Sequence, residues 1–255
     1  MNRNGKRYIA SKLKKTHALK KDKMIAAHIP PTKSFGMNTL HRMVRQYRAV
    51  YLKPVNGLKG RGVMRARKLN TKYELRGGTS RVIFNDFHSF YRFIVRQIGS
   101  KPYLVQKGIR MLRYHRRPFD LRVMVLKNEL RNWEVAGIVG RVAPPRMIVT
   151  NRSQGGRIMS AARLLRRHMK KRATKNYLQS LYGLSRATGR QFQRVFPKVW
   201  ELGVDVAISR RRRKPWILEV NTNPAITPFV KLGNRRMYSR ITDLKRWNTR
   251  NYPIY

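Results

Sequence analysis

The stretch VYLKPVNGLKGRGV, residues 50–63, joins an apolar run to a lysine and three glycines. The apolar residues before the lysine are typical of a buried strand. Gly57, Gly60 and Gly62 give the following loop a backbone that can adopt positive φ and approach a ligand closely. The pattern indicates a strand that delivers Lys53 to a phosphate-binding loop. For this stretch alone, a glycine-rich hairpin beside a surface lysine is an equal alternative.

Two familiar phosphate-binding fingerprints do not fit this loop. Walker A requires Gly-Lys followed by Ser or Thr, and the dinucleotide fingerprint requires Gly-x-Gly-x-x-Gly opening a helix. Residues 57–62 have neither spacing. Other parts of the chain must therefore decide what the loop binds.

The charge of the chain is strongly positive. Its 255 residues include 60 Lys and Arg but 10 Asp and Glu, which gives a formal net charge of +50. Counterion release then favours salt-dependent binding to nucleic acid or another anionic polymer. The densest basic segments are 164–172 and 209–214. Trp133, Trp216 and Trp247 could stack on bases if exposed, but core packing is expected for the first two.

Several classes of protein and site are excluded by composition. Cysteine is absent, so the chain has no disulfide framework and no thiolate metal site. The six histidines lack ligand spacing. No apolar run approaches the length of a transmembrane helix, and the N-terminus lacks the apolar core of a signal peptide, so we expect synthesis in the cytoplasm.

The order of expected elements indicates an α+β fold with a basic N-terminal arm (1–36), two subdomains (37–106 and 107–232) and a C-terminal basic tail or helix (233–255). Asp86 and Gly99 are expected to cap a helix between them. Three helical segments are expected between about 160 and 202. Strands are expected at 50–52, 72–76, 80–84, 103–109, 119–128, 133–142, 202–209 and within 215–225.

The segment WILEVNTNP, residues 216–224, places a carboxylate in an apolar strand. With a period of two, Ile217, Glu219 and Asn221 share a face and the residues between them are buried behind it. A carboxylate and an amide oxygen suit Mg²⁺, which combines one or two carboxylates with substrate phosphates. An edge strand with solvated polar side chains is the alternative. The scarcity of acids favours the functional interpretation.

Five segments occur in the order found in ATP-grasp proteins, and the chain most closely resembles the YheC/YheD family associated with endospore coats. HIPPT (28–32) resembles that family's segment before the ATP module, so the resemblance spans nearly the whole chain. It implies an ATP-grasp fold, in which a lid-side subdomain (37–106) and a core subdomain (107–232) clamp a nucleotide. The five segments are VYLKP-x2-G-x2-G-x-GV, YLVQKGI, PFDLRVMV, VTNRSQGG, and LGVDVAI followed by WILEVNTNP.

The resemblance implies roles for the lid-side residues. Lys53 would contact the ATP phosphates as a catalytic cation. The loop that carries Gly57, Gly60 and Gly62 would close over the phosphates and donate backbone N–H groups.

For the core side, the resemblance implies an adenine hinge and a charge clamp. Gln106, Lys107 and Ile109 would form the hinge against the adenine. Arg122 would face the phosphates, and Asp120 would either orient Arg122 or reach the ribose.

The resemblance also implies a metal site, with one departure. Glu219, Asn221 and Asp205 would ligate Mg²⁺. Relatives usually read D-x-x-x-D from the position of Asp205, whereas this chain has Ser209 at the second acid. The basic residues 210–214 that follow are either a solvated hairpin turn or a source of charge that partly replaces metal in holding ATP.

The implied function is an ATP-grasp protein that binds Mg·ATP. It would act as a spore-associated, ATP-dependent carboxylate-amine or carboxylate-thiol ligase through an acylphosphate, on an acceptor that the sequence does not identify. The alternative is a catalytically weakened ATP-grasp scaffold that binds an anionic polymer or nucleic acid through its basic surface. A basic protein without any nucleotide site is the weakest interpretation, since the five ordered segments would be coincidental.

Overall fold

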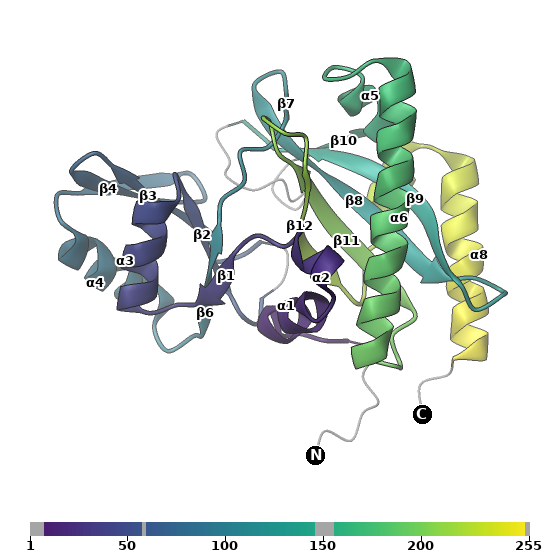
Figure 1. Ribbon diagram of the computed structural model, residues 1–255, viewed down its shortest axis with the longest axis horizontal. Coiled ribbons are helices and arrows are strands. Elements are labelled where there is room, and N and C mark those ends of the chain that lie inside the picture. The colour runs from purple at the N-terminus through teal and green to yellow at the C-terminus, as the bar shows by residue number, and fades with distance from the viewer. Residues whose placement is uncertain (1–7, 58–59, 146–155, 253–255) are drawn as a thin grey trace.

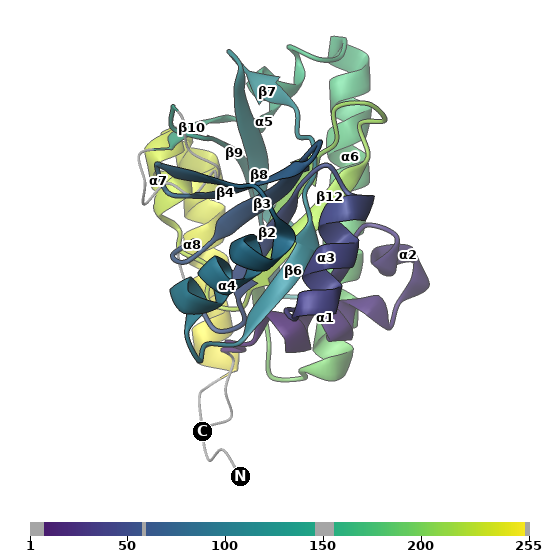
Figure 2. The same ribbon diagram turned by 90° about the vertical axis from the view of Figure 1, so that its left-hand side faces the viewer.

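The computed structural model describes residues 8–57, 60–145 and 156–252, arranged around two antiparallel sheets. Figure 1 shows the lid-side sheet at the left and the core sheet at the right, and Figure 2 shows the lid-side sheet in front of the core. No helix among the described residues is both long enough and apolar enough to cross a membrane.

The lid-side sheet carries the strand predicted at residue 50. Helices α3 (Met37–Gln46) and α4 (Phe87–Ile98) bury their apolar faces against it. The predicted caps of α4 are confirmed, because the Asp86 carboxylate accepts a hydrogen bond from Ser89 N at 2.8 Å and Gly99 has φ 56°. In spatial order the strands are β1 (Thr32–Ser34), β6 (Tyr103–Lys107), β2 (Val50–Pro54), β3 (Met64–Leu69), β4 (Lys72–Gly77) and β5 (Ser80–Phe84).

Strand β3 has no counterpart in the sequence prediction. Its residues MRARKL lack an apolar alternation, because three of the six are basic. The buried Glu74 on β4 pairs with Arg65 and Arg67 at 3.0 Å each, so a neighbouring strand compensates the charges. Cross-strand ion pairs therefore stabilise a strand that a search for alternating apolar residues does not predict.

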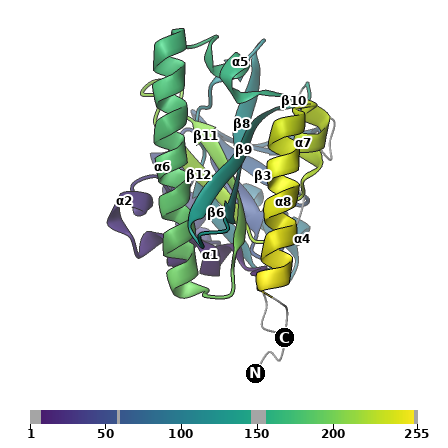
Figure 3. The ribbon, with the colours of Figure 1, turned by 90° about the vertical axis from the view of Figure 1, so that its right-hand side faces the viewer.

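The core sheet is covered on both faces. Helices α1 (Lys12–Lys20), α2 (Lys23–Ala26), α5 (Ala161–Leu165) and α6 (Lys171–Val195) pack on one face, and α7 (Thr227–Leu232) and α8 (Arg235–Asn251) pack on the other. Figure 3 shows α6 and α8 on either side of this sheet. In spatial order the strands are β10 (Arg157–Ser160), β9 (Trp133–Val142), β8 (Arg117–Lys127), β11 (Glu201–Ile208) and β12 (Pro215–Asn221), and β7 (Arg113–Tyr114) pairs with β8.

The N-terminal segment is folded into the molecule. Leu19 of α1 and Ile25 of α2 are buried in the main core cluster, which is the set of apolar side chains packed between the core sheet and α6. Strand β1 is an edge strand of the lid-side sheet and pairs with β6. The predicted boundary after residue 36 therefore does not separate an independent arm. The many lysines of this segment mask the few apolar residues that anchor it.

The three helical segments expected between residues 160 and 202 are two in the structure, α5 and α6. Helix α6 continues for 25 residues through Gly183 and Gly189. A Cβ atom at Gly189 would lie 2.5 Å from Cδ2 of Trp133 on β9. This close packing on the sheet accounts for Gly189 in the helix, although glycine disfavours helix by itself.

Strand β12 contains a β-bulge that changes which residues share a face. Asp205 pairs with Glu219, but its neighbour Val206 pairs with Ile217, so Leu218 is the extra residue. Ile217 is buried in the main core cluster, whereas Leu218 lies beside Glu219 in the cleft. The prediction that Ile217 and Glu219 share a face is therefore wrong, because a bulge breaks the period of two.

Candidate functional site

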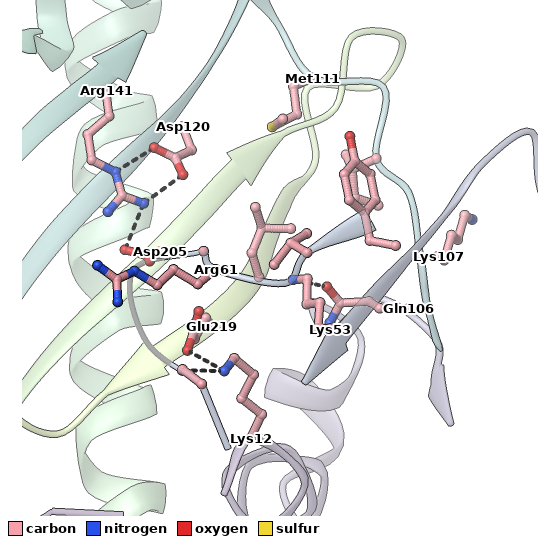
Figure 4. Close-up of a pocket in the computed structure, with 16 residues that line it drawn as sticks. Lys12, Lys53, Arg61, Gln106, Lys107, Met111, Asp120, Arg141, Asp205 and Glu219 are labelled. Atoms are coloured by element: carbon pink, nitrogen blue, oxygen red, sulfur yellow. Dashed lines mark hydrogen bonds and ion pairs between the residues drawn. The ribbon is translucent and has the colours of Figure 1, made fainter. Parts of the chain in front are cut away.

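A cleft lies between the lid-side sheet and the core sheet, with one edge formed by α1. Figure 4 shows side chains from β2, β6, β8, β9, β11, β12 and α1 directed toward it. Its volume is about 120 Å³, whereas ligand pockets are usually about 300–1,000 Å³. The charged lining residues are Lys12, Lys53, Arg61, Lys107, Asp120, Arg141, Asp205 and Glu219.

Lys53 extends into the cleft from β2. It alternates with the buried Leu52 and Pro54, so its side chain points to the face of the strand opposite the subdomain core. Its ammonium donates a hydrogen bond to Gln106 Oε1 at 2.6 Å, and Gln106 Nε2 donates to Thr32 Oγ1 at 3.0 Å. Burial lowers the pKa of Lys53, and the nearby Glu219 charge opposes that shift. The predicted phosphate cation is thus positioned by an amide.

The glycine loop adopts the backbone that the sequence predicts. Gly60 and Gly62 have φ 73° and 71°, and Gly57 and Gly60 line the cleft. Gly62 lies outside the cleft lining, where its carbonyl accepts a hydrogen bond from the Tyr103 hydroxyl at 3.1 Å. A Cβ atom at Gly62 would lie 2.7 Å from that hydroxyl oxygen, so a larger residue does not fit. The loop is therefore anchored at Gly62 and contributes to the cleft from Gly57 and Gly60.

The predicted hinge segment also reaches the cleft. Gln106, Lys107 and Ile109 all line it, and Gly108 N donates to Ala49 O at 2.8 Å. A side chain at position 108 would meet that carbonyl oxygen at 2.8 Å. This close backbone contact fixes the direction in which the chain leaves β6. The side chains of Gln106, Lys107 and Ile109 remain at the cleft.

Four charged side chains form a cross-strand network on β11, β8 and β9. Arg122 donates to Asp205 through Nε at 2.5 Å and a terminal nitrogen at 3.0 Å. Arg141 donates to Asp120 at 2.8 and 2.7 Å and lies 3.0 Å from Asp205 Oδ1. In the registers, Asp205 is opposite Arg122 and Asp120 is opposite Arg141. The pairs are bidentate and buried, which makes them strong and rigid.

This network determines the protonation state of Asp205. Burial alone would raise the pKa of Asp205, but the charges of Arg122 and Arg141 and their hydrogen bonds lower it to about 2. Burial likewise opposes the charge of Arg141, and the carboxylates of Asp120 and Asp205 overcome this and raise its pKa. Asp205 and Arg141 are therefore both charged at neutral pH.

The structure assigns the cleft-facing arginine to a different strand from the one predicted. Arg122 is 8% exposed and is bound to Asp205, whereas Arg141 on β9 lines the cleft together with Arg61 of the glycine loop. Asp120, expected to orient Arg122 or reach the ribose, pairs with Arg141. An arginine in a strand did not stand out in a chain with 60 basic residues.

An N-terminal lysine contacts the predicted metal carboxylate. Lys12 Nζ lies 3.7 Å from Glu219 Oε1 and donates to the Gly57 carbonyl at 2.6 Å (Figure 4). Lys15 lies one turn further along α1, and burial lowers its pKa against the raising effect of Glu219. Lys12 thus joins α1, the glycine loop and β12. Sequence reasoning missed Lys12 and Lys15 because the N-terminal segment was interpreted as an arm.

The three predicted metal ligands lie near one another but differ in their availability. Asn221 Nδ2 is 3.5 Å from Asp205 Oδ2, and both Asp205 oxygens accept hydrogen bonds from Arg122. Among the described residues no group of three or more His, Cys, Asp or Glu side chains could hold a metal ion. The donor set that fits Mg²⁺ is therefore Glu219 with the Asn221 oxygen, completed by phosphate oxygens.

Ser209, which stands where relatives have an acid, closes the hairpin between β11 and β12. Its hydroxyl accepts a hydrogen bond from Lys214 N at 3.0 Å. The arginines at 210–213 are exposed in that turn, and none of them lines the cleft. The cation that approaches the metal carboxylate is instead Lys12.

A family model described as YheC/D-like ATP-grasp matches residues 4–245. The chain belongs to this family. The endospore coat-associated protein YheD of Bacillus subtilis (strain 168) is 23% identical over 222 residues, which cover 83% of this chain and 47% of that protein. The chain thus spans about half the length of this relative.

Solved structures show the same ATP-grasp fold. D-cycloserine synthetase DcsG matches with a TM-score of 0.58 and 10% identity, over 93% of this chain and 70% of that protein. The ATP-grasp ligase PsnB, complexed with a phosphomimetic precursor variant, Mg and ADP, matches with a TM-score of 0.50 and 11% identity, over 92% and 59%. At these identities the likeness establishes the fold, and the predicted α+β ATP-grasp fold is confirmed.

Proposed function

We propose that this protein binds Mg·ATP in the cleft between its two sheets and uses it to activate a carboxylate for ligation to an amine or a thiol. The observation that carries the proposal is the convergence of Lys53 from the lid side with Glu219 and Arg141 from the core side on one cavity. Family membership supports ATP as the nucleotide. The Mg and ADP complex of PsnB is a precedent for the metal in this fold.

Different residues of the cleft would bind different parts of ATP. Gln106, Lys107 and Ile109 would contact the adenine, with Asp120 held by Arg141 at the rim of the same cavity. Lys53 and the N–H groups of the glycine loop would bind the phosphates. Arg141 would face the transferred phosphate, a role that the family resemblance implied for Arg122, while Arg122 holds Asp205 in place.

The reaction needs positioned charges and no nucleophile from the protein. A substrate carboxylate oxygen would attack the γ-phosphorus as the bond to the bridging oxygen of ADP breaks, giving an acylphosphate and ADP. The amine or thiol would then attack the acyl carbon, release inorganic phosphate and lose a proton. Lys53 and Arg141 would stabilise the charge that develops on the phosphoryl oxygens.

Mg²⁺ fits the residues present with Glu219 and Asn221 as its protein ligands. When bound, it would neutralise charge on the β- and γ-phosphates during transfer. Glu219 becomes free to bind Mg²⁺ if the Lys12 ammonium moves from Glu219 to the ATP phosphates, which are also favourable partners for a cation. Asp205, predicted as a third ligand, would have to release Arg122 and Arg141 first, so we assign it a positioning role.

Calorimetric titration of Mg·ATP into the wild type, Lys53→Ala and Lys68→Ala tests the proposal. Lys68 is exposed on β3, so its variant loses the same charge without touching the cleft. At physiological salt, where screening acts over about 8 Å, the wild type and Lys68→Ala should each bind one ATP. Lys53→Ala should bind at least about tenfold more weakly. If the wild type and both variants bound ATP equally, and only at low salt, the net charge alone would account for the attraction of ATP.

A second candidate function is a nucleotide-binding scaffold with weakened catalysis. The observation that favours it is that the three cleft carboxylates Asp120, Asp205 and Glu219 each have a cationic partner from the chain. Such a protein would bind ATP but form no ADP with any carboxylate. An ADP-release assay over a panel of carboxylate and amine pairs separates the two functions, since turnover with any pair excludes the scaffold.

The family also suggests a cellular location. YheD is named an endospore coat-associated protein. We extend the proposal to synthesis in the cytoplasm followed by association with the spore coat. Immunodetection in purified coat fractions checks it, and absence from the coat of mature spores would remove this part of the proposal.

A further inference from the structure

A second concave site lies away from the ATP cleft, between α6 and the β8–β9 hairpin. It has a volume of about 780 Å³. Figure 3 shows α6 beside β8 and β9 on the side of the molecule turned away from the lid-side sheet. Four exposed arginines line it, Arg131 on the hairpin and Arg186, Arg190 and Arg194 on α6. We call this site the arginine groove.

The arginines on α6 form a regular row. They are four residues apart, so successive guanidinium groups follow one another at about 6 Å along the helix. This step is close to the separation of successive phosphates along one nucleic-acid strand. A guanidinium group can bind two phosphate oxygens at once, which a lysine cannot.

The positive charge of the groove is not neutralised by the residues described around it. None of the ion pairs found in residues 8–57, 60–145 and 156–252 involves these four arginines. Glu134 is the one acid of the lining, and Arg240 from α8 holds both of its oxygens at 2.8 and 2.7 Å. This contrasts with the ATP cleft, where each carboxylate has a cationic partner.

The groove is lined by several side-chain amides, and its tryptophan is covered. Trp133 is 5% exposed, covered by Gly189, and donates through its indole N–H to Gln193 Oε1 at 3.1 Å. Lys127 Nζ lies 5.3 Å from the centre of its ring. Because the indole is covered, bases cannot stack on it; the other aromatic ring of the lining, Tyr182, is partly buried. Contacts from the arginines would therefore go mainly to the backbone.

We propose that the arginine groove binds the sugar-phosphate backbone of a nucleic-acid strand without sequence preference. The row of arginines supplies three phosphate contacts, and Arg131 supplies a fourth from the opposite wall. This activity goes beyond ATP binding and does not depend on it. It also differs from the basic segments 164–172 and 209–214, which are dense in charge but do not line this groove.

The test measures fluorescence anisotropy of a labelled 12-nucleotide single-stranded RNA over a series of salt concentrations. The groove variant is R186Q/R190Q/R194Q, and the matched control is R210Q/R211Q/R212Q, which removes the same charge from the β11–β12 turn. Glutamine preserves the helix propensity of α6. Circular dichroism and ATP titration confirm that each variant is folded.

The groove variant should lose at least about tenfold in affinity at physiological salt, and its slope of log affinity against log salt should fall by about 2, since each phosphate contact on a single strand contributes about 0.7. The control should lose less than about threefold. Equal losses in both variants would overturn the proposal in favour of diffuse charge. Equal affinity of the wild type for polyglutamate of matched charge would overturn the choice of nucleic acid.

Discussion

Lys12 places a positive charge beside Glu219, which we propose as a ligand of Mg²⁺. Its ammonium lies 3.7 Å from Glu219 Oε1 and is held by the Gly57 carbonyl, so it joins the metal carboxylate to the glycine loop. A cation of the chain and Mg²⁺ cannot both occupy the same side of one carboxylate. Lys12 is therefore expected to compete with Mg²⁺ until ATP phosphates offer the ammonium another partner.

Replacement of Lys12 by Met should strengthen Mg²⁺ binding. Removing a partly buried ion pair of this kind changes the free energy by about 1 kcal/mol, so the Mg²⁺ concentration for half-maximal ATP binding should fall about fivefold. Titration of Mg²⁺ at fixed ATP, with ATP binding as the signal, measures the change. Lys14→Met, an exposed neighbour on α1, is the control. A requirement that rises in Lys12→Met would show that Lys12 binds phosphate and does not compete with metal.

At the scale of elements, strand pairing decides how charges are distributed in the cleft. Registers between β11, β8 and β9 set Asp205 opposite Arg122 and Asp120 opposite Arg141. The same face of β8 carries the buried Met124 and Leu126 further along, under α8. One face of β8 therefore packs into the core beneath α8 at one end of the strand and forms a charged wall of the cleft at the other end.

The buried carboxylate of Asp205 makes stability depend on pH. Its pKa is lowered to about 2 in the folded protein, against about 3.9 in an unfolded chain. Its contribution of about 2–3 kcal/mol is fully present above about pH 5 and is lost progressively as the pH falls through 4 and past 2. Urea unfolding at pH 7, 4 and 2.5 measures the loss.

Asp205→Asn should remove this dependence and lower the free energy of unfolding by about 3 kcal/mol at pH 7, because two buried arginines lose their partner. Asp243→Asn, at an exposed position on α8, is the matched control and should change stability little. If Asp205→Asn and the wild type lost stability in parallel on acidification, Asp205 would not be the group that titrates.

Two glycines of α6 should respond oppositely to alanine. A Cβ atom at Gly189 meets Trp133 at 2.5 Å, so Gly189→Ala should lower the free energy of unfolding by about 1–3 kcal/mol through overpacking. A Cβ atom at Gly183 has no heavy atom within 4 Å, so Gly183→Ala should raise it by up to about 1 kcal/mol. Thermal unfolding of both variants checks the pair, and destabilisation by Gly183→Ala would contradict the open environment.

At the scale of the whole molecule, the basic residues that give the net charge of +50 differ from site to site in whether acidic side chains pair with them. In the cleft proposed for ATP, each of the three carboxylates has a cationic partner. In the arginine groove, the four arginines have no ion-pair partner among the described residues, and for this reason we propose a polyanion as its ligand. The two sites lie on different sides of the core sheet, so ATP and a nucleic-acid strand could bind at once.

Much of the fold could be predicted from the sequence because helices and strands depend on local backbone geometry. The helix cap at Asp86, the positive φ of Gly60 and Gly62, and the alternation of β8 follow from neighbouring residues. Family membership also follows from the order of short segments. Most of the predicted ATP-contacting residues line one cleft for the same reason, since strand ends and turns carry them there.

Only the tertiary structure decided which charges meet. Arg141 faces the cleft where Arg122 was expected, Lys12 reaches Glu219 from a segment predicted to be an arm, and one extra residue at Leu218 reverses the face of Ile217. These outcomes depend on strand register, on a bulge and on helix docking across long sequence separations. In a chain with 60 basic residues, no local pattern distinguishes the few cations that pair with its 10 acids.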